Sequence, residues 1–166
     1  MTTGFLIYQI VKKIKGEKLA LISASIYLFN PAIIANSTLW GQIDSLTALF
    51  FLLSIYLIKK FPALSFLVLS FGTLVKLQCA LAAPIILLIM IRDKFKPRKI
   101  VGYISLAFAI FLLGFLPFFP GDANFFSFVI ERISITLNQY PFGSVNAFNF
   151  WGLWGFWKPD GVGLIT

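Results

Sequence analysis

Long apolar runs separated by short polar segments are the main pattern of this chain. The runs cover residues 19–35, 43–58, 63–91 and 100–118. A hydrocarbon core of about 30 Å is crossed by roughly 20 predominantly apolar residues in a helix. The pattern therefore predicts an all-α chain, a polytopic membrane helical bundle.

Local interruptions refine these spans. The segment 3–14 has too few apolar residues to cross and is predicted to be the tail of an upstream helix. The run 19–35 is interrupted near its far end by Asn30-Pro31, because proline disfavours a continuous helix there. The run 63–91 is too long for one helix, and Lys76, Gln78 and Pro84 mark its middle. It is predicted to form two short spans, 63–77 and 79–91, with a bend near Lys76 to Ala80.

Composition supports a membrane protein. Hydrophobic residues make up 59% of the chain and charged residues 12%, with a mean hydropathy of +0.91. Soluble domains carry about 25% charged residues, so this chain has too little charge to cover a water-facing surface.

The net charge of +8 is unevenly distributed. Basic residues cluster between the apolar runs, which is typical of cytoplasmic loops and argues against nucleic acid as a partner. With one cysteine, no intrachain disulfide can form. If these clusters are cytoplasmic, region 121–166 lies outside. Eleven of the fourteen basic residues belong to three clusters: Lys12, Lys13, Lys15 and Lys18; Lys59 and Lys60; Arg92, Lys94, Lys96, Arg98 and Lys99.

Asp44 stands directly before an apolar run and has two interpretations. As a helix N-cap it would accept a backbone N–H and favour the positive end of the helix dipole. As a functional carboxylate at membrane depth it would work with neighbouring groups, since buried polar groups are costly there. Trp40 and Gln42 place a ring and an amide beside it.

Lys76 also has two interpretations. Its side chain could extend from a helix end toward water. Alternatively, it is a cation in partly apolar surroundings that binds a phosphate or pyrophosphate group. Gln78 would add an amide donor.

The region 121–166 is predicted to be external, with an amphipathic helix over 124–138 and an aromatic, Asn-rich loop over 138–157. The helix, which carries Glu131 and Arg132, is expected to lie on the membrane surface or to pack as an anchor. In the loop, rings and amides form either a sugar-binding surface or an interfacial aromatic belt. The candidate binding residues there are Tyr140, Asn146, Asn149 and Trp151.

Absent residues narrow the chemistry. The chain has no histidine, so a general base must be a carboxylate, and Ser-His-Asp and Cys-His nucleophiles are excluded. No zinc-site spacing, P-loop or GxGxxG motif occurs. The remaining carboxylates, cations, amides and rings suit glycosyl transfer from a lipid-phosphate sugar.

Three segments carry a resemblance to a known family. "NPAIIANSTLWGQIDSL" (30–46), "GTLVKLQCALAAPIILL" (72–88) and "NAFNFW" (146–151) resemble, in order, segments of the GT-C membrane glycosyltransferases. Members similar to this chain include the catalytic subunit of GPI mannosyltransferase and prokaryotic mannosyltransferases. The resemblance covers roughly residues 19–151.

This resemblance implies a GT-C type bundle with an external re-entrant or loop region. It implies an inverting hexosyltransferase, expected to transfer mannose from a polyprenyl-phosphate or dolichyl-phosphate donor to a glycan, lipid or protein acceptor. Gln42 and Asp44 would lie by the donor–acceptor site, with Asp44 as a supporting carboxylate, and Lys76 near the lipid phosphate.

The chain departs from the family in lacking a paired acidic motif, which predicts a fragment truncated at both ends whose main catalytic base lies upstream. No cofactor is required on this interpretation, although a divalent metal is compatible with it. The expected location is the prokaryotic plasma membrane, or the endoplasmic reticulum in a eukaryote. Two alternatives stay open: a fragment of a transporter or flippase with Asp44 and Lys76 as a relay, and a non-catalytic membrane assembly subunit.

Overall fold

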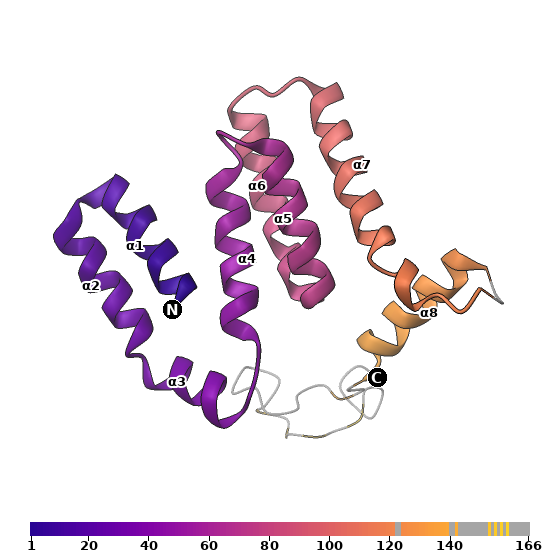
Figure 1. Cartoon of the computed structure of the whole chain (residues 1–166), viewed down its shortest axis with the longest axis horizontal. Helices are drawn as coiled ribbons and strands as arrows, with labels where there is room; N and C mark the ends of the chain where they lie inside the picture. Colours follow the sequence, from indigo (N-terminus) through magenta and orange to yellow (C-terminus); the bar gives the residue numbers. More distant parts are fainter. Residues whose placement is uncertain are drawn as a thin grey trace. The chain divides into compact units, whose positions relative to one another are not determined.

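The computed structural model, drawn in Figure 1, describes residues 1–121 and 124–139, together with 142, 153, 155, 157 and 159. Helices are the only regular elements among these residues, apart from one isolated bridge between Phe142 and Pro159. The predicted all-α class is therefore confirmed. The chain divides into two compact units, Met1–Leu116 and Pro117–Thr166.

The first unit contains seven of the α-helices, and the second contains α8 (Figure 1). The helices are α1 (Thr2–Lys15), α2 (Glu17–Leu28), α3 (Pro31–Ile34), α4 (Asp44–Leu57), α5 (Pro62–Val75), α6 (Ala82–Arg92), α7 (Pro97–Leu113) and α8 (Phe125–Leu137). Short helical turns connect some of these helices: a π-helical turn over Ala35–Leu39 precedes α4, a 3₁₀ helix over Leu77–Leu81 precedes α6, and a 3₁₀ turn over Leu116–Phe118 follows α7.

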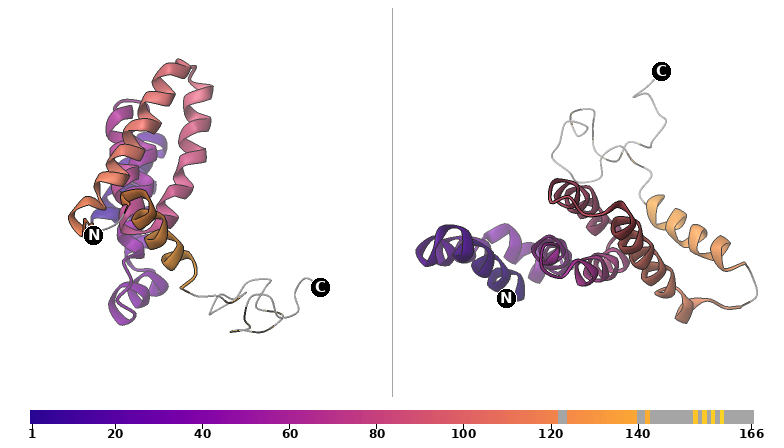
Figure 2. Two further views of the ribbon diagram at one scale, coloured as in Figure 1. Left: turned by 90° about the vertical axis from the view of Figure 1, so that its right-hand side faces the viewer. Right: turned by 90° about the horizontal axis from the view of Figure 1, so that it is seen from above.

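The helices α1 and α2 form an antiparallel pair (Figures 1 and 2). Gly16 separates them with φ +85°, a conformation that residues with a Cβ rarely adopt. At the other end of α2, the Asn30 side chain accepts a hydrogen bond of 2.9 Å from Ala32 N, and Pro31 starts the next helix. The chain bends by 47° at this point. The predicted interruption of 19–35 is therefore confirmed.

A second predicted break lies at Lys76. The helix α5 ends at Val75, and Lys76 takes an extended backbone conformation with φ −156° and ψ 120°. The 3₁₀ helix and α6 follow, so residues 63–91 form two helices that meet near Lys76 to Ala80, as the sequence predicts.

Only some of the described apolar helices are long enough to cross a membrane. Within the described ranges, Pro97–Phe118 has the length and hydropathy of a membrane span, and the bent pair Glu17–Leu28 and Pro31–Leu39 adds a second if it counts as one span. The apolar helices α4 and α5 have 14 residues each. At 1.5 Å per residue each is about 21 Å long, which is short of a core of about 30 Å. The predicted multi-pass bundle therefore remains a prediction.

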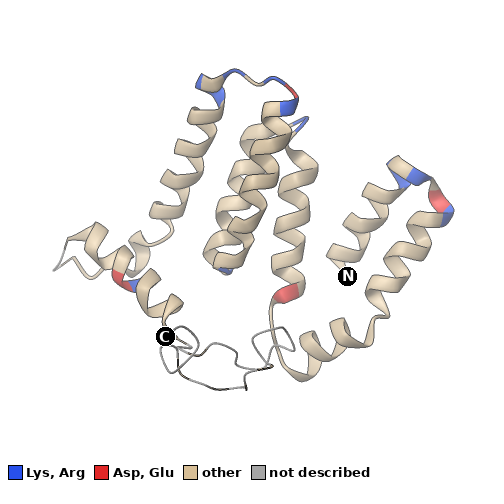
Figure 3. Cartoon of the chain, turned by 180° about the vertical axis from the view of Figure 1, so that it is seen from behind, with Lys and Arg blue, Asp and Glu red and all other residues tan. Residues whose placement is uncertain are grey.

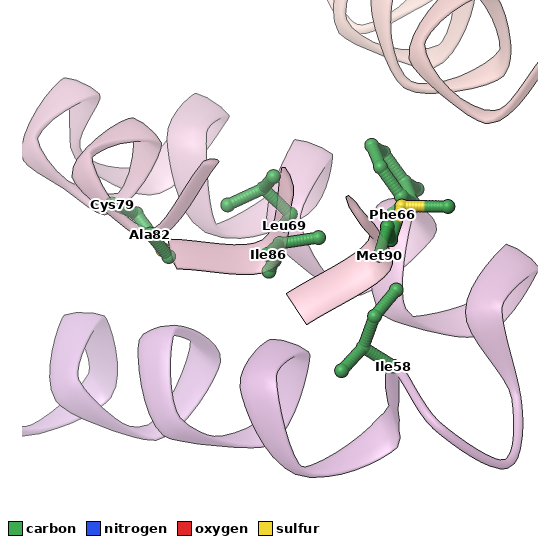
Figure 4. Packing of buried hydrophobic residues seen from close by; sticks show 7 residues of the cluster. All are labelled: Ile58, Phe66, Leu69, Cys79, Ala82, Ile86 and Met90. Carbon is green, nitrogen blue, oxygen red and sulfur yellow. The ribbon is translucent and has the colours of Figure 1, made fainter. Parts of the chain in front are cut away.

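The hydrophobic core of the first unit joins α5, α6 and the end of α4, as Figure 4 shows from close by. Helix α7 packs against the same region: the Phe66 and Tyr103 rings stack with centroids 5.8 Å apart, and the Ser70 hydroxyl donates to Ala107 O at 2.6 Å. The core consists of Ile58, Phe66, Leu69, Cys79, Ala82, Ile86 and Met90.

Contacts between helix ends show which of these ends lie together in the first unit. Near the start of both α1 and α4, the Thr3 hydroxyl donates to Ser45 O at 2.8 Å, and near their other ends Lys13 contacts Tyr56. Lys59, after α4, lies 3.7 Å from Asp93, after α6. The three basic clusters therefore lie at one end of this unit, opposite the start of α4. Figure 3 shows this concentration of basic residues at the helix connections.

In the second unit, α8 confirms the predicted helix over 124–138. Asn124 caps it by accepting from Phe126 N at 2.9 Å and Ser127 N at 3.3 Å. Phe128 is buried, and its ring lies 5.6 Å from that of Phe119. Phe126 and Ile130 are exposed, so α8 keeps an apolar surface beside its polar one.

Candidate functional site

Asp44 begins α4 but does not cap it. The N-cap position is Ile43, and no side chain makes a capping hydrogen bond there. The Asp44 carboxylate is used elsewhere: Oδ1 accepts from Lys76 Nζ, and Oδ2 accepts from Asn36 Nδ2 at 3.2 Å. The helix-cap interpretation of Asp44 is therefore wrong, because a tertiary ion pair and an amide take both oxygens.

Lys76 reaches Asp44 from the break between α5 and the 3₁₀ helix. Because α4 and α5 run antiparallel, the start of α4 and the end of α5 lie at the same end of the unit. The two side chains form an ion pair with exposed fractions of 29% for Lys76 and 45% for Asp44. The ammonium therefore has an anionic partner in place of free exposure to water.

This ion pair lies on the wall of an open pocket of about 510 Å³. Gln78 and Thr47 add polar atoms, and the remaining lining is apolar, from α4 residues Ala48, Phe51 and Leu52. Three residues that the sequence singles out separately, Asp44, Lys76 and Gln78, thus line one pocket. The pocket lies at the end of the first unit opposite the basic clusters.

Asn36 belongs to this arrangement, although the sequence analysis missed it. It lies in the π-helical turn Ala35–Leu39, a kind of turn that is frequent at functional sites. Its backbone carbonyl accepts from Gln42 N at 3.0 Å, and the neighbouring Ser37 and Ser45 hydroxyls are 3.0 Å apart. The available signal was the polar run Asn36-Ser37-Thr38 between two apolar segments.

Trp40 and Gln42 lie in the connection between the π-helical turn and α4. Both are exposed, Trp40 at 67%, and neither is among the residues that line the Asp44 pocket. Gly41 between them has φ +67°, which turns the chain toward α4. Both residues are close to Asp44 in sequence, but neither lines the pocket.

The remaining predicted site residues belong to the second unit. Glu131 and Arg132 on α8 form an exposed ion pair at 3.7 Å, and the Arg132 guanidinium lies 5.3 Å from the Phe128 ring centroid. The other four predicted residues lie outside the described residues: Tyr140, Asn146, Asn149 and Trp151.

A second pocket, of about 340 Å³, lies between α5, α6 and α7. Its walls are almost entirely apolar, with Phe66 and Leu69 on α5, Leu87 on α6 and Phe108 on α7. Thr73 and Ala80 line it near the α5–α6 break. An apolar cavity of this kind suits a hydrocarbon chain.

The polar groups that line the Asp44 pocket are one ammonium, one carboxylate, the Gln78 amide and the Thr47 hydroxyl, and the Asn36 amide supports the carboxylate from outside the lining. In the part of the chain that the structure describes, no three His, Cys, Asp or Glu side chains form a group that could hold a metal ion. Comparison with family models, characterised proteins and solved structures found no match to this chain.

Proposed function

We propose that this chain is a membrane glycosyltransferase of GT-C type that moves a sugar, mannose by preference, from a polyprenyl-phosphate donor to an acceptor hydroxyl. The observation that carries the proposal is the meeting of Asp44, Lys76 and Gln78 in one pocket of an otherwise apolar helical unit. A cation and an amide suit the phosphate of the donor, and a carboxylate suits the acceptor hydroxyl.

The proposed reaction proceeds by inversion at the anomeric carbon. The acceptor oxygen attacks this carbon while the bond from the carbon to the phosphate oxygen breaks, and the electron pair leaves with the phosphate. The hydroxyl proton passes to a carboxylate. Lys76 would stabilise the negative charge that grows on the leaving phosphate, and Asp44 would support the acceptor side.

The lipid part of the donor has a matching environment. The apolar pocket between α5, α6 and α7 approaches the Lys76 break through Thr73 and Ala80. A polyprenyl chain would lie against such walls while its phosphate stays at the polar end of the unit.

Membrane topology is part of the same proposal. The basic clusters at one end of the first unit would face the cytoplasm, as positively charged loops do. The Asp44 pocket, at the opposite end, would then open on the outer or lumenal face. The chain would be multi-pass, with the short helices α4, α5 and α6 around a water-accessible cavity.

Turnover of the full-length protein with a polyprenyl-phosphate mannose donor tests this function. Asp44→Asn should lower turnover at least about tenfold, or about 1.4 kcal/mol of barrier, while Lys76→Gln should mainly raise KM for the donor. Asp93→Asn is the matched control, because it breaks the 3.7 Å ion pair with Lys59 at the opposite end. Full turnover in Asp44→Asn, at normal expression, would show that the pocket is not the transfer site.

A second candidate is a transporter or flippase. An ion pair within a pocket of apolar helices is also the arrangement of a charge relay in transport proteins. Such a protein, reconstituted in proteoliposomes, would move a lipid-linked or soluble substrate across the membrane without forming a glycosylated product. One assay that follows both movement and product therefore separates the two functions.

A further inference from the structure

Both oxygens of Asp44 are engaged in the structure. Oδ1 accepts from the Lys76 ammonium and Oδ2 from the Asn36 amide at 3.2 Å. Among the described residues, Asp44 is the only acidic partner of Lys76. The cation proposed to bind phosphate is therefore already neutralised, and the carboxylate proposed to act on the acceptor is already covered.

We infer that Asp44 competes with the phosphate group of the ligand for Lys76, so that phosphate binding opens the ion pair and uncovers the carboxylate. This inference rests on the proposed function, since it concerns the same pocket. A phosphate monoester or diester offers several strong acceptor oxygens and at least one negative charge, which an ammonium can bind in exchange for a carboxylate.

The surroundings favour Lys76 as the partner that moves. Asp44 is held by Asn36 and lies in the first turn of α4, where the helix dipole stabilises a negative charge without a counter-ion. Lys76 follows the end of α5 in an extended backbone conformation and has a long, flexible side chain. Gln78, which lines the same pocket, gives the phosphate a second donor once Lys76 has turned toward it.

The consequence is an order of events. Without a phosphate ligand, the charges of Lys76 and Asp44 cancel, and the carboxylate is not free to act on an acceptor. With the ligand bound, Lys76 carries the phosphate, and Asp44, still held by Asn36, becomes available to the acceptor. Because the ion pair must open first, the pocket binds lipid phosphate more weakly than it would if Asp44 did not compete for Lys76.

Binding of polyprenyl phosphate without a sugar, measured on the full chain in nanodiscs, tests this competition. Asp44→Asn should bind about fivefold more tightly than the unchanged chain, as expected when an ion pair of about 1 kcal/mol no longer has to open. Lys76→Gln should bind at least about tenfold more weakly. Asp93→Asn, which breaks the ion pair at the opposite end, should leave the affinity unchanged. Polyprenol, which lacks the phosphate, should bind all four proteins equally.

The outcomes separate this inference from the proposed function. If Lys76→Gln binds polyprenyl phosphate normally, the phosphate site and the proposed function both fail. If Lys76→Gln weakens binding but Asp44→Asn does not tighten it, only the competition is wrong. Asp44→Ser serves as a second neutral variant. If neither neutral variant folds, as judged by thermal unfolding, the ion pair is required by the fold and competition is likewise overturned.

Discussion

The tight contact of α5 with α4 at Gly72 allows a quantitative test of the fold. Gly72 lies one turn before the end of α5, and a Cβ at this position would be 2.5 Å from Cys79 Sγ and 2.6 Å from Phe50 Cβ. Ordinary contact begins at 3.4 Å, so the Phe50 distance is short by about 0.8 Å. Since Phe50 Cβ is fixed to the backbone of α4, the two helices must move apart to accept Gly72→Ala.

The expected cost combines two opposing effects. Overpacking a close helix contact costs about 1–3 kcal/mol, while replacing glycine by alanine within a helix returns up to about 1 kcal/mol. Gly72→Ala should therefore lose about 1 kcal/mol, and Gly72→Val, with two more methyl groups and a β-branched side chain, should lose more. For a chain of this size, 1 kcal/mol corresponds to a fall in Tm of about 3 °C.

Thermal unfolding of the purified protein in one detergent provides the assay. Gly102→Ala is the matched control, because a Cβ there would have nothing within 4 Å and the residue is exposed on α7. It should leave Tm unchanged or raise it slightly. If Gly72→Ala is as stable as the unchanged chain while Gly102→Ala behaves as expected, the close packing of α4 on α5 at Gly72 is incorrect.

Two further predictions concern the membrane. In a Cys79→Ser background, a cysteine at Ser37 should react with an impermeant thiol reagent from outside intact cells, and one at Lys96 should not; the reverse pattern would invert the proposed topology. A spin label at Phe126, on the exposed apolar surface of α8, should be better protected from a water-soluble relaxing agent than one at Glu131, five residues on and on the opposite side of the helix, when the full chain is in nanodiscs; equal accessibility would show that α8 does not lie in the membrane surface.

The helices and their breaks could be predicted because local chemistry decides them. Asn30-Pro31 ends one helical segment through side-chain capping and the fixed proline φ, and both act within a few residues. The break at Lys76 was marked by two polar residues in an apolar run. The short lengths of α4 and α5 also followed from the sequence, since the predicted spans 43–58 and 63–77 end within two residues of the observed helices.

The role of Asp44 could not be obtained in this way. Local rules favour an N-cap wherever aspartate precedes an apolar helix, whereas its partners lie 8 and 32 residues away in sequence, at Asn36 and Lys76. That contact exists only because α4 and α5 run antiparallel and approach closely at Gly72. Asn36 was missed for a related reason, since its amide becomes relevant only when the π-helical turn brings it back to α4.

The pairing of Asp44 with Lys76 also explains how a polar site can persist in this apolar unit. An isolated charge among apolar helices is costly, but a carboxylate shared between an ammonium and an amide has its charge and its acceptors satisfied. On the proposed function, this paired site would stay closed to anions that bind Lys76 weakly and would open for a phosphate group that a hydrophobic chain holds near it. If the apolar pocket supplies that second contact, inorganic phosphate alone should bind far more weakly than polyprenyl phosphate, and equal affinities would show that the apolar pocket takes no part in binding.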